Sequence, residues 1–291
     1  ANRWIAHHAA TQNIAFVTHV GDVVGTPVAE HYDDARRCLE PIHGSLPYGL
    51  CPGNRDIIPP NGDTSAYARA FGQRAFSRFP WYVDAAFGGI CSAQTFTAMN
   101  QRYLAMHLPC NATDPMLDWA NTVLAAHADR TALVTTHMYL GPVDKLPDKS
   151  RWRESPLGVM RWRKCFGDSG NCPQRLWDRC FQHHANVRLI FCGDQSRVQA
   201  MHLTQHRDGM PPVHSLMSDY RAGAIRLVRI TPGTGQVEVI TFSPFLRQLI
   251  HSTEQAPALH LHQFSFRLSD EIQSDPEPRG RWTRAQHNGR Q

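Results

Sequence analysis

The stretch NIAFVTHVGDVV, residues 13–24, decides the fold of this chain. It contains an apolar, β-branched run over residues 14–20, which is typical of a buried strand. The run ends on Gly21 and Asp22, so a carboxylate follows the carboxyl end of the predicted strand. A glycine beside such a residue permits the sharp turn and the close backbone approach that a ligand site needs.

Three other polar clusters follow apolar runs in the same way. They are Gly53-Asn54-Arg55-Asp56 after residues 48–51, Thr136-His137 after 132–135, and Gly193-Asp194 after 187–192. The carboxyl ends of strands in an α/β sheet form the ligand crevice, so we expect the four clusters to converge. Carboxylate, amide and imidazole ligands suit Mn, Fe or Zn, metals that polarise a phosphoryl oxygen. Taken singly, each residue also fits a turn or a packed core position; the shared order and setting favour a site.

The remaining periodicity indicates an α/β class. Further strand candidates cover residues 213–217, 225–230 and 237–242, and helical patterns cover residues 1–10, 32–39, 65–76, 115–127 and 173–184. Asp114 is the expected N-cap of the fourth helix. Strands that alternate with helices predict a layered α/β domain, which we place at residues 1–268, followed by a polar, flexible tail at 269–291. Because helical spacing is present from the first residue, we expect the chain to begin inside a domain, with a segment upstream.

Composition limits the function classes. The chain has 291 residues, 42% of them hydrophobic, and a formal net charge of +5, which is compatible with phosphate-bearing partners but too small to demand nucleic acid. No apolar run approaches the roughly 20 residues of a membrane-spanning helix. Of eight cysteines, Cys51 and Cys192 adjoin strand-like runs and are expected as buried thiols. Cys165, Cys172 and Cys180 leave pairing or metal binding open. The compartment is undetermined; we favour the inside of a cell or organelle over secretion.

The ordered motifs resemble the calcineurin-like metallophosphoesterases, specifically their bacterial-type branch. The resemblance runs over residues 4–5, 13–24, 47–56, 119–121, 136–140, 218–221, 225–230 and 241–244. It implies a four-layer sandwich in which two mixed β-sheets pack face to face and are flanked by helices. It also implies that Asp22 is a bridging carboxylate and that Asn54 and His137 are ligands of the second metal.

The chain departs from the family pattern at three places. Arg55 replaces the histidine of the family's GNHD motif, so the candidate catalytic residues become Arg55 and Asp56; an arginine binds phosphate but is no general acid at neutral pH. Residues 193–196 read Gly-Asp-Gln-Ser where the family has GHxH, which leaves Asp194 as a further candidate ligand. The opening Asp-x-His or Asp-x-Gln motif is not in this chain. The resemblance therefore implies at most one divalent ion (Mn, Fe or Zn), or none.

Three functions follow as hypotheses. The leading one is a degenerate metallophosphoesterase-like protein, impaired in catalysis and kept as a binding or scaffold component of a larger assembly of proteins. The first alternative is an active phosphoesterase acting on phosphomonoesters or phosphodiesters. The second is RNA or phosphate binding through the basic segment 145–164, whose candidate contacts are Arg151, Arg153, Arg161, Arg163 and Lys164, with two tryptophans between them. That segment also fits a solvated loop.

Overall fold

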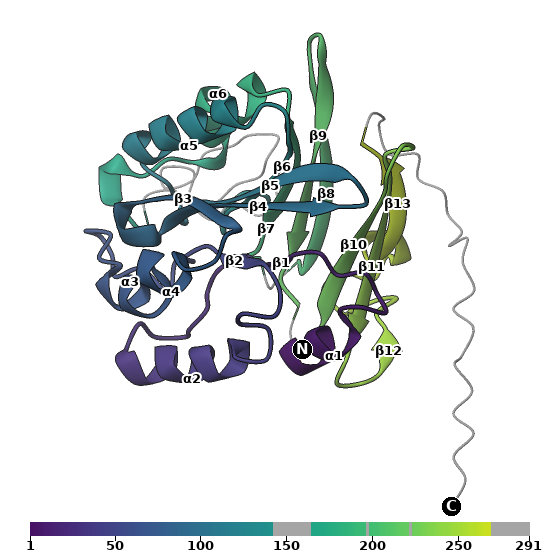
Figure 1. The fold of residues 1–291 in the computed structure, drawn as a ribbon, viewed down its shortest axis with the longest axis horizontal. Helices are drawn as coiled ribbons and strands as arrows, with labels where there is room; N and C mark the ends of the chain where they lie inside the picture. Colours follow the sequence, from purple (N-terminus) through teal and green to yellow (C-terminus); the bar gives the residue numbers. More distant parts are fainter. Residues whose placement is uncertain (142–163, 196–197, 221–222, 269–291) are drawn as a thin grey trace, which may run out of the picture.

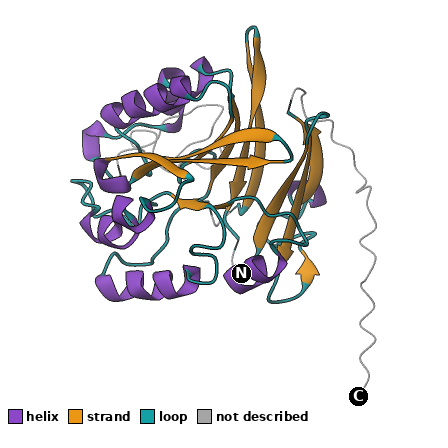
Figure 2. Ribbon diagram, viewed as in Figure 1, coloured by secondary structure: helices purple, strands orange, loops and turns teal. Residues whose placement is uncertain are grey.

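Two β-sheets packed face to face form the body of the protein, with most helices on one side of the larger sheet (Figure 1, Figure 2). The structure is a computed structural model that describes residues 1–141, 164–195, 198–220 and 223–268. The predicted α/β class with two sheets is confirmed. The predicted tail lies outside the described residues.

The larger sheet has seven strands in the order β3-β4-β5-β6-β7-β9-β8. The strands are β3 (Tyr82–Ala86), β4 (Cys91–Ala98), β5 (Gln101–His107), β6 (Thr131–Thr135), β7 (Val187–Cys192), β8 (Ala200–Arg207) and β9 (Met210–Ser218). The central pairs β5-β6, β6-β7 and β7-β9 are parallel, whereas both edges are antiparallel, so the sheet is mixed. A parallel centre directs the carboxyl ends of β6 and β7 to the same edge.

The smaller sheet is built by the C-terminal part of the chain. Its strands are β10 (Ile225–Thr231), β11 (Gln236–Ser243), β12 (Gln248–Leu249) and β13 (Gln263–Arg267). Every described pair in it is antiparallel, so this sheet is not mixed as the resemblance implied. The β10-β11 hairpin turns at the predicted residues 232–235. The buried contact between the two sheets consists of Tyr103, Leu133, Leu189, Leu216, Val237, Val239 and Phe266.

Most helices cover the other face of the large sheet. The helices are α1 (Asn2–His8), α2 (Ala29–Leu39), α3 (Ser65–Phe71), α4 (Gln73–Phe76), α5 (Asp114–Ala126) and α6 (Pro173–Arg179). Leu117 and Leu124 of α5 and Leu176 of α6 share one buried cluster with Val134 and Ile190 of the sheet. Helix α1 instead packs on the smaller sheet, where the rings of Trp4 and Phe242 are 4.5 Å apart. No described helix has the length and apolar character required to cross a membrane.

Two predicted helices are interrupted, and one begins a residue earlier than expected. The helix at 65–76 breaks at Gly72, whose backbone is extended and packs so closely that a Cβ there would lie 2.5 Å from the Gly88 carbonyl oxygen. The helix at 173–184 ends at Arg179 and is followed by a 3-10 turn over Phe181–His183, where Arg207 donates to the carbonyls of Phe181 and His184. The N-cap of α5 is Thr113 rather than Asp114.

A short parallel pair lies beside the large sheet and carries the first two motifs. It consists of β1 (Val17–His19) and β2 (Tyr48–Leu50). Thr18 bonds across to the sheet, with its hydroxyl 2.8 Å from that of Thr135 and 2.9 Å from Nε2 of His107. The ends of β1 and β2 are thereby fixed next to the ends of β6 and β7.

Candidate metal and phosphate site

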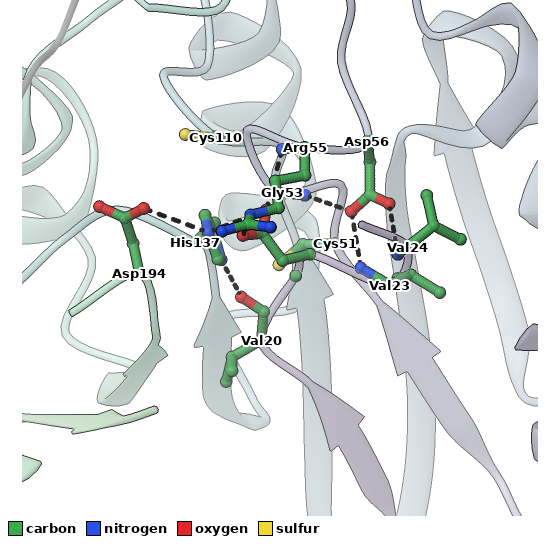
Figure 3. A network of polar contacts seen from close by, with 12 residues as sticks. Val20, Val23, Val24, Cys51, Gly53, Arg55, Asp56, Cys110, His137 and Asp194 are labelled. Carbon is green, nitrogen blue, oxygen red and sulfur yellow. Dashed lines mark hydrogen bonds and ion pairs between the residues drawn. The ribbon is translucent and has the colours of Figure 1, made fainter. Parts of the chain in front are cut away.

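The four predicted polar clusters meet at the carboxyl ends of β1, β2, β6 and β7 (Figure 3). Backbone hydrogen bonds connect the loops that follow these strands, from the Gly193 amide to the His137 carbonyl at 2.8 Å and from the Cys51 amide to the His19 carbonyl at 3.3 Å. The clusters come from positions between 21 and 194 of the chain. The expected convergence is therefore what the structure shows.

His137 lies at the centre of the site. Its side chain is only 3% exposed, and Nδ1 donates to the Val20 carbonyl at 2.6 Å. Nε2 therefore faces the ligand side, 3.2 Å from Oδ1 of Asp22 and 3.6 Å from Oδ1 of Asp194, without a hydrogen bond of good geometry. Burial opposes a charge on the ring, but the two carboxylates outweigh it and raise the pKa of His137 to about 10. The ring is thus arranged to share a positive charge with both carboxylates.

Asp22 lies on a tight loop that requires glycine at position 21, beside it in the chain, and at position 53, which packs against it. Asp22 has a φ of +53° and Gly21 one of +99°, both in the left-handed region. A Cβ at Gly21 would lie 2.6 Å from Nδ1 of His137, and one at Gly53 would lie 2.1 Å from the Asp22 amide nitrogen. These two glycines are therefore required by close approach and not only by turn formation.

The Asp22 carboxylate is stabilised in its charged form. Burial raises its pKa, but His137, the Arg55 amide that donates to Oδ1 at 2.9 Å and the Arg55 guanidinium together lower it below the ordinary value. Nε of Arg55 lies 3.4 Å from Oδ2 of Asp22, and the Arg55 side chain is 62% exposed. Arg55 thus reaches from the carboxylate toward solvent.

Asn54 joins the second carboxylate to a lysine. In the orientation that satisfies both ends of its amide, the NH2 group donates to Oδ1 of Asp194 at 2.7 Å, and the oxygen accepts from Nζ of Lys164 at 2.7 Å and from the Arg55 amide at 3.2 Å. Asp194 has a φ of +66°, and its Oδ2 accepts from the Gln195 side chain at 2.9 Å. The loop after β7 is thereby aimed at Asn54 and His137.

Asp56 lies behind the site. Its carboxylate accepts backbone amides from Gly53 at 2.8 Å, Val23 at 2.9 Å and Val24 at 3.1 Å. Burial raises the pKa of Asp56 above its ordinary value in spite of these donors. Both oxygens are occupied by the protein, which is the arrangement of a residue that positions two loops; the predicted catalytic role of Asp56 stays a prediction.

The predicted divalent ion stays a prediction, and the separations around His137 are what bear on it. Ligand atoms that share such an ion at about 2.1 Å lie roughly 3.0–3.5 Å apart, which is close to the separations of Nε2 of His137 from the two carboxylates. In the metal-free site Nε2 carries a proton that faces the two carboxylate oxygens, and a cation bound there would take the place of that proton. Across residues 1–141, 164–195, 198–220 and 223–268, however, no group of three or more His, Cys, Asp or Glu side chains is arranged so that it could hold a metal ion. Asn54 turns its NH2 group toward Asp194, so its oxygen would have to leave Lys164 before it could become a fourth donor.

Some predicted site residues lie outside the described part of the chain, and one residue beside the site was not predicted. Arg151, Arg153, Arg161 and Arg163 of the basic segment, and Ser196, fall outside the described residues. His19 was not predicted, yet it is half-buried behind Asp22, and burial together with His137 lowers its pKa to about 4. His19 and Val23 line a cavity of about 340 Å³ between α1 and α2. The VTHV stretch directly before Gly21 was the signal that could have indicated it.

Comparison with known proteins gives matches of low sequence identity. No protein-family profile matches the chain. A protein of Bacillus subtilis (strain 168) described as uncharacterized protein YvnB is 24% identical over 256 residues, which is 84% of this chain and 18% of that protein. The chain thus spans about a fifth of the relative's length. The crystal structure of TT1561 from Thermus thermophilus is similar over 86% of this chain and 90% of that one, with 11% identity and a TM-score of 0.43.

Proposed function

We propose that this chain is a degenerate, calcineurin-like metallophosphoesterase-type protein that binds a phosphorylated ligand, holds at most one divalent ion, and hydrolyses phosphate esters weakly or not at all. The observation that carries the proposal is the buried Nε2 atom of His137, which faces the carboxylates of Asp22 and Asp194 together. The order of the four motifs along the chain supports the same reading.

One ion position is supported by the donors, and a second is not. Asp22 and Asp194 both face Nε2 of His137, and Asn54 is hydrogen-bonded to Asp194, whereas Gln195 is buried with its NH2 group on Asp194. A bound ion would supply charge stabilisation for a phosphoryl oxygen. Hydrolysis by two ions also requires a second ion to orient the water and stabilise the leaving group, so its loss should cost several orders of magnitude in rate.

Arg55 supports binding over turnover. Its exposed guanidinium lies against Asp22 and still has N–H donors for a phosphate oxygen. The guanidinium stays protonated at neutral pH, so it cannot give a proton to a leaving group. Arg55 therefore holds phosphate at this position but supplies no proton to a leaving alkoxide.

The test is metal content together with turnover of an aryl phosphate. The purified chain is loaded with Mn²⁺, desalted and analysed by elemental analysis, in parallel with Asp22→Ala, His137→Ala and the exposed control Asp33→Ala. We expect no more than one ion per chain in the wild type and the Asp33 control, loss of that ion in the other two, and turnover near the buffer background in all four. Two ions per chain with turnover abolished by Asp22→Ala would show an active phosphoesterase instead.

A further inference from the structure

We infer that Lys164 is a tethered cation that takes the place of a divalent ion at the Asn54–Asp194 side of the site, so that the site binds phosphate without metal. The inference rests on the proposed function and deepens it, because it names what neutralises the carboxylates and what holds the ligand. It starts from one contact in the orientation of the Asn54 amide that satisfies both of its ends: the amide oxygen then lies 2.7 Å from Nζ of Lys164.

The contact with Lys164 decides whether the Asn54 amide oxygen is available to bind a metal ion. An amide binds a metal through its oxygen, and here that oxygen already accepts from Lys164 and from the Arg55 backbone. The NH2 group of the same amide donates to Asp194, which holds the side chain in this orientation. An ion at this position must therefore displace an ammonium group and rotate an amide that is 8% exposed.

Charge balance leads to the same conclusion. The ligand side of the site holds two carboxylates, Asp22 and Asp194, since Asp56 is turned away toward backbone amides. Besides the His137 ring, which lies between the two carboxylates, two fixed cations stand against them: the Arg55 guanidinium beside Asp22 and the Lys164 ammonium beside Asn54. The chain thus supplies from its own residues the positive charge that a metal would otherwise bring.

The positions of the two cations suit a phosphate dianion. Arg55 reaches Asp22 through Nε, which leaves the two terminal nitrogens of its planar fork for oxygen ligands. Lys164 uses one donor on Asn54 and carries two more N–H groups. Both side chains are only partly covered, so an anion from solvent can reach them. The ligand class is inorganic phosphate or the phosphate group of a monoester.

The experiment measures Mn²⁺ and inorganic phosphate binding separately, by calorimetry on the full chain. Phosphate is titrated in the presence of a chelator, and Mn²⁺ is titrated in the absence of phosphate. The variants are Lys164→Met, Lys164→Arg and Arg74→Met, the last of which removes one positive charge from the exposed face of α4. Circular dichroism checks that each variant is folded.

We expect the wild type to bind phosphate without metal and Lys164→Met to bind it at least about tenfold more weakly, while its Mn²⁺ affinity rises by about tenfold or more. Lys164→Arg should keep phosphate binding, and Arg74→Met should match the wild type in both titrations. Absence of metal-free phosphate binding, or a Lys164→Met variant unchanged in either titration, would overturn the inference. The proposed function is judged separately, from the ion count and turnover of the wild type alone.

Discussion

Asp56 and Val23 are 33 positions apart in the chain, yet Oδ2 of Asp56 accepts the Val23 amide at 2.9 Å. The same oxygen accepts the Gly53 amide at 2.8 Å, so one atom joins the loop after β1 to the loop after β2. Asp22 and Asn54 stand on these two loops. The relative position of Asp22 and Asn54 is therefore set by the Asp56 carboxylate, whose described hydrogen bonds go to backbone amides and to Tyr32.

Replacing Asp56 with Asn should destabilise the fold. The amide keeps one acceptor oxygen, so at least one of the three backbone amides loses its partner and faces an NH2 group instead. We expect the free energy of unfolding to fall by about 2 kcal/mol, measured by urea denaturation. The exposed control Asp33→Asn on α2 should change it by less than about 0.5 kcal/mol. Equal stabilities of the two variants would contradict this role.

Stability should fall as the pH drops below 6.5, in part because of His107. Burial, with a contribution from His19, lowers the pKa of His107 from 6.5 to about 3. A base whose pKa is depressed by folding is neutral in the folded chain and takes up a proton on unfolding, so its stabilisation is complete above 6.5 and is lost between 6.5 and about 3. We expect a slope of about 1.4 kcal/mol per pH unit from this group.

The variant His107→Gln removes that titration. Between pH 6 and 4.5, its unfolding free energy should change with pH less steeply than that of the wild type, by about 1.4 kcal/mol per pH unit, because about one proton fewer is taken up on unfolding. The exposed control His7→Gln should retain the full slope. Urea titrations at several pH values provide the measurement. Parallel profiles for wild type and His107→Gln would show that the imidazole is charged in the folded chain.

Two of the strands missed by periodicity, β4 and β5, carry buried polar residues. Gln94 of β4 and His107 of β5 are almost fully buried, and Oε1 of Gln94 accepts from Nδ1 of His107 at 2.8 Å. Nε2 of His107 then lies 2.9 Å from the Thr18 hydroxyl. A polar network that satisfies itself removes the apolar alternation by which a strand is recognised. Strand β7, whose residues are apolar except for Arg188, was predicted with both boundaries correct.

The convergence of the site was predictable, whereas its inner contacts were not. Parallel strands end at one edge, so Asp22, Asn54, His137 and Asp194 could be placed together from order alone. The link between Lys164 and Asn54 depends on how the chain returns after the His137 motif, which no local pattern encodes. In the same way, the buried orientation of Asp56 depends on two loops that are distant in sequence.

Among the cysteines, only Cys38 should react quickly with a thiol reagent. All eight lie in the described residues as thiols, and Cys38 alone is exposed. Burial raises the pKa of Cys51, Cys91, Cys110, Cys180 and Cys192, which keeps them protonated and unreactive. Ellman's reagent should therefore titrate one fast thiol in native buffer and eight in denaturant, and Cys38→Ser should remove the fast one. Several fast thiols in the native chain would show that the core opens readily.

Gly53→Ala should damage both the fold and the site. The added methyl would lie 2.1 Å from the Asp22 amide nitrogen and 2.3 Å from its Oδ1, so the loop carrying Asp22 must shift away from His137. Overpacking of this kind costs roughly 2–3 kcal/mol, and Mn²⁺ or phosphate binding should weaken because the carboxylate moves. Gly25→Ala is the matched control, because its Cβ would meet nothing within 4 Å. That variant should stay within about 0.5 kcal/mol of the wild type and bind as the wild type does. If Gly53→Ala behaved like Gly25→Ala in urea denaturation and in calorimetry, the close approach of the two loops would not be what holds Asp22 in place.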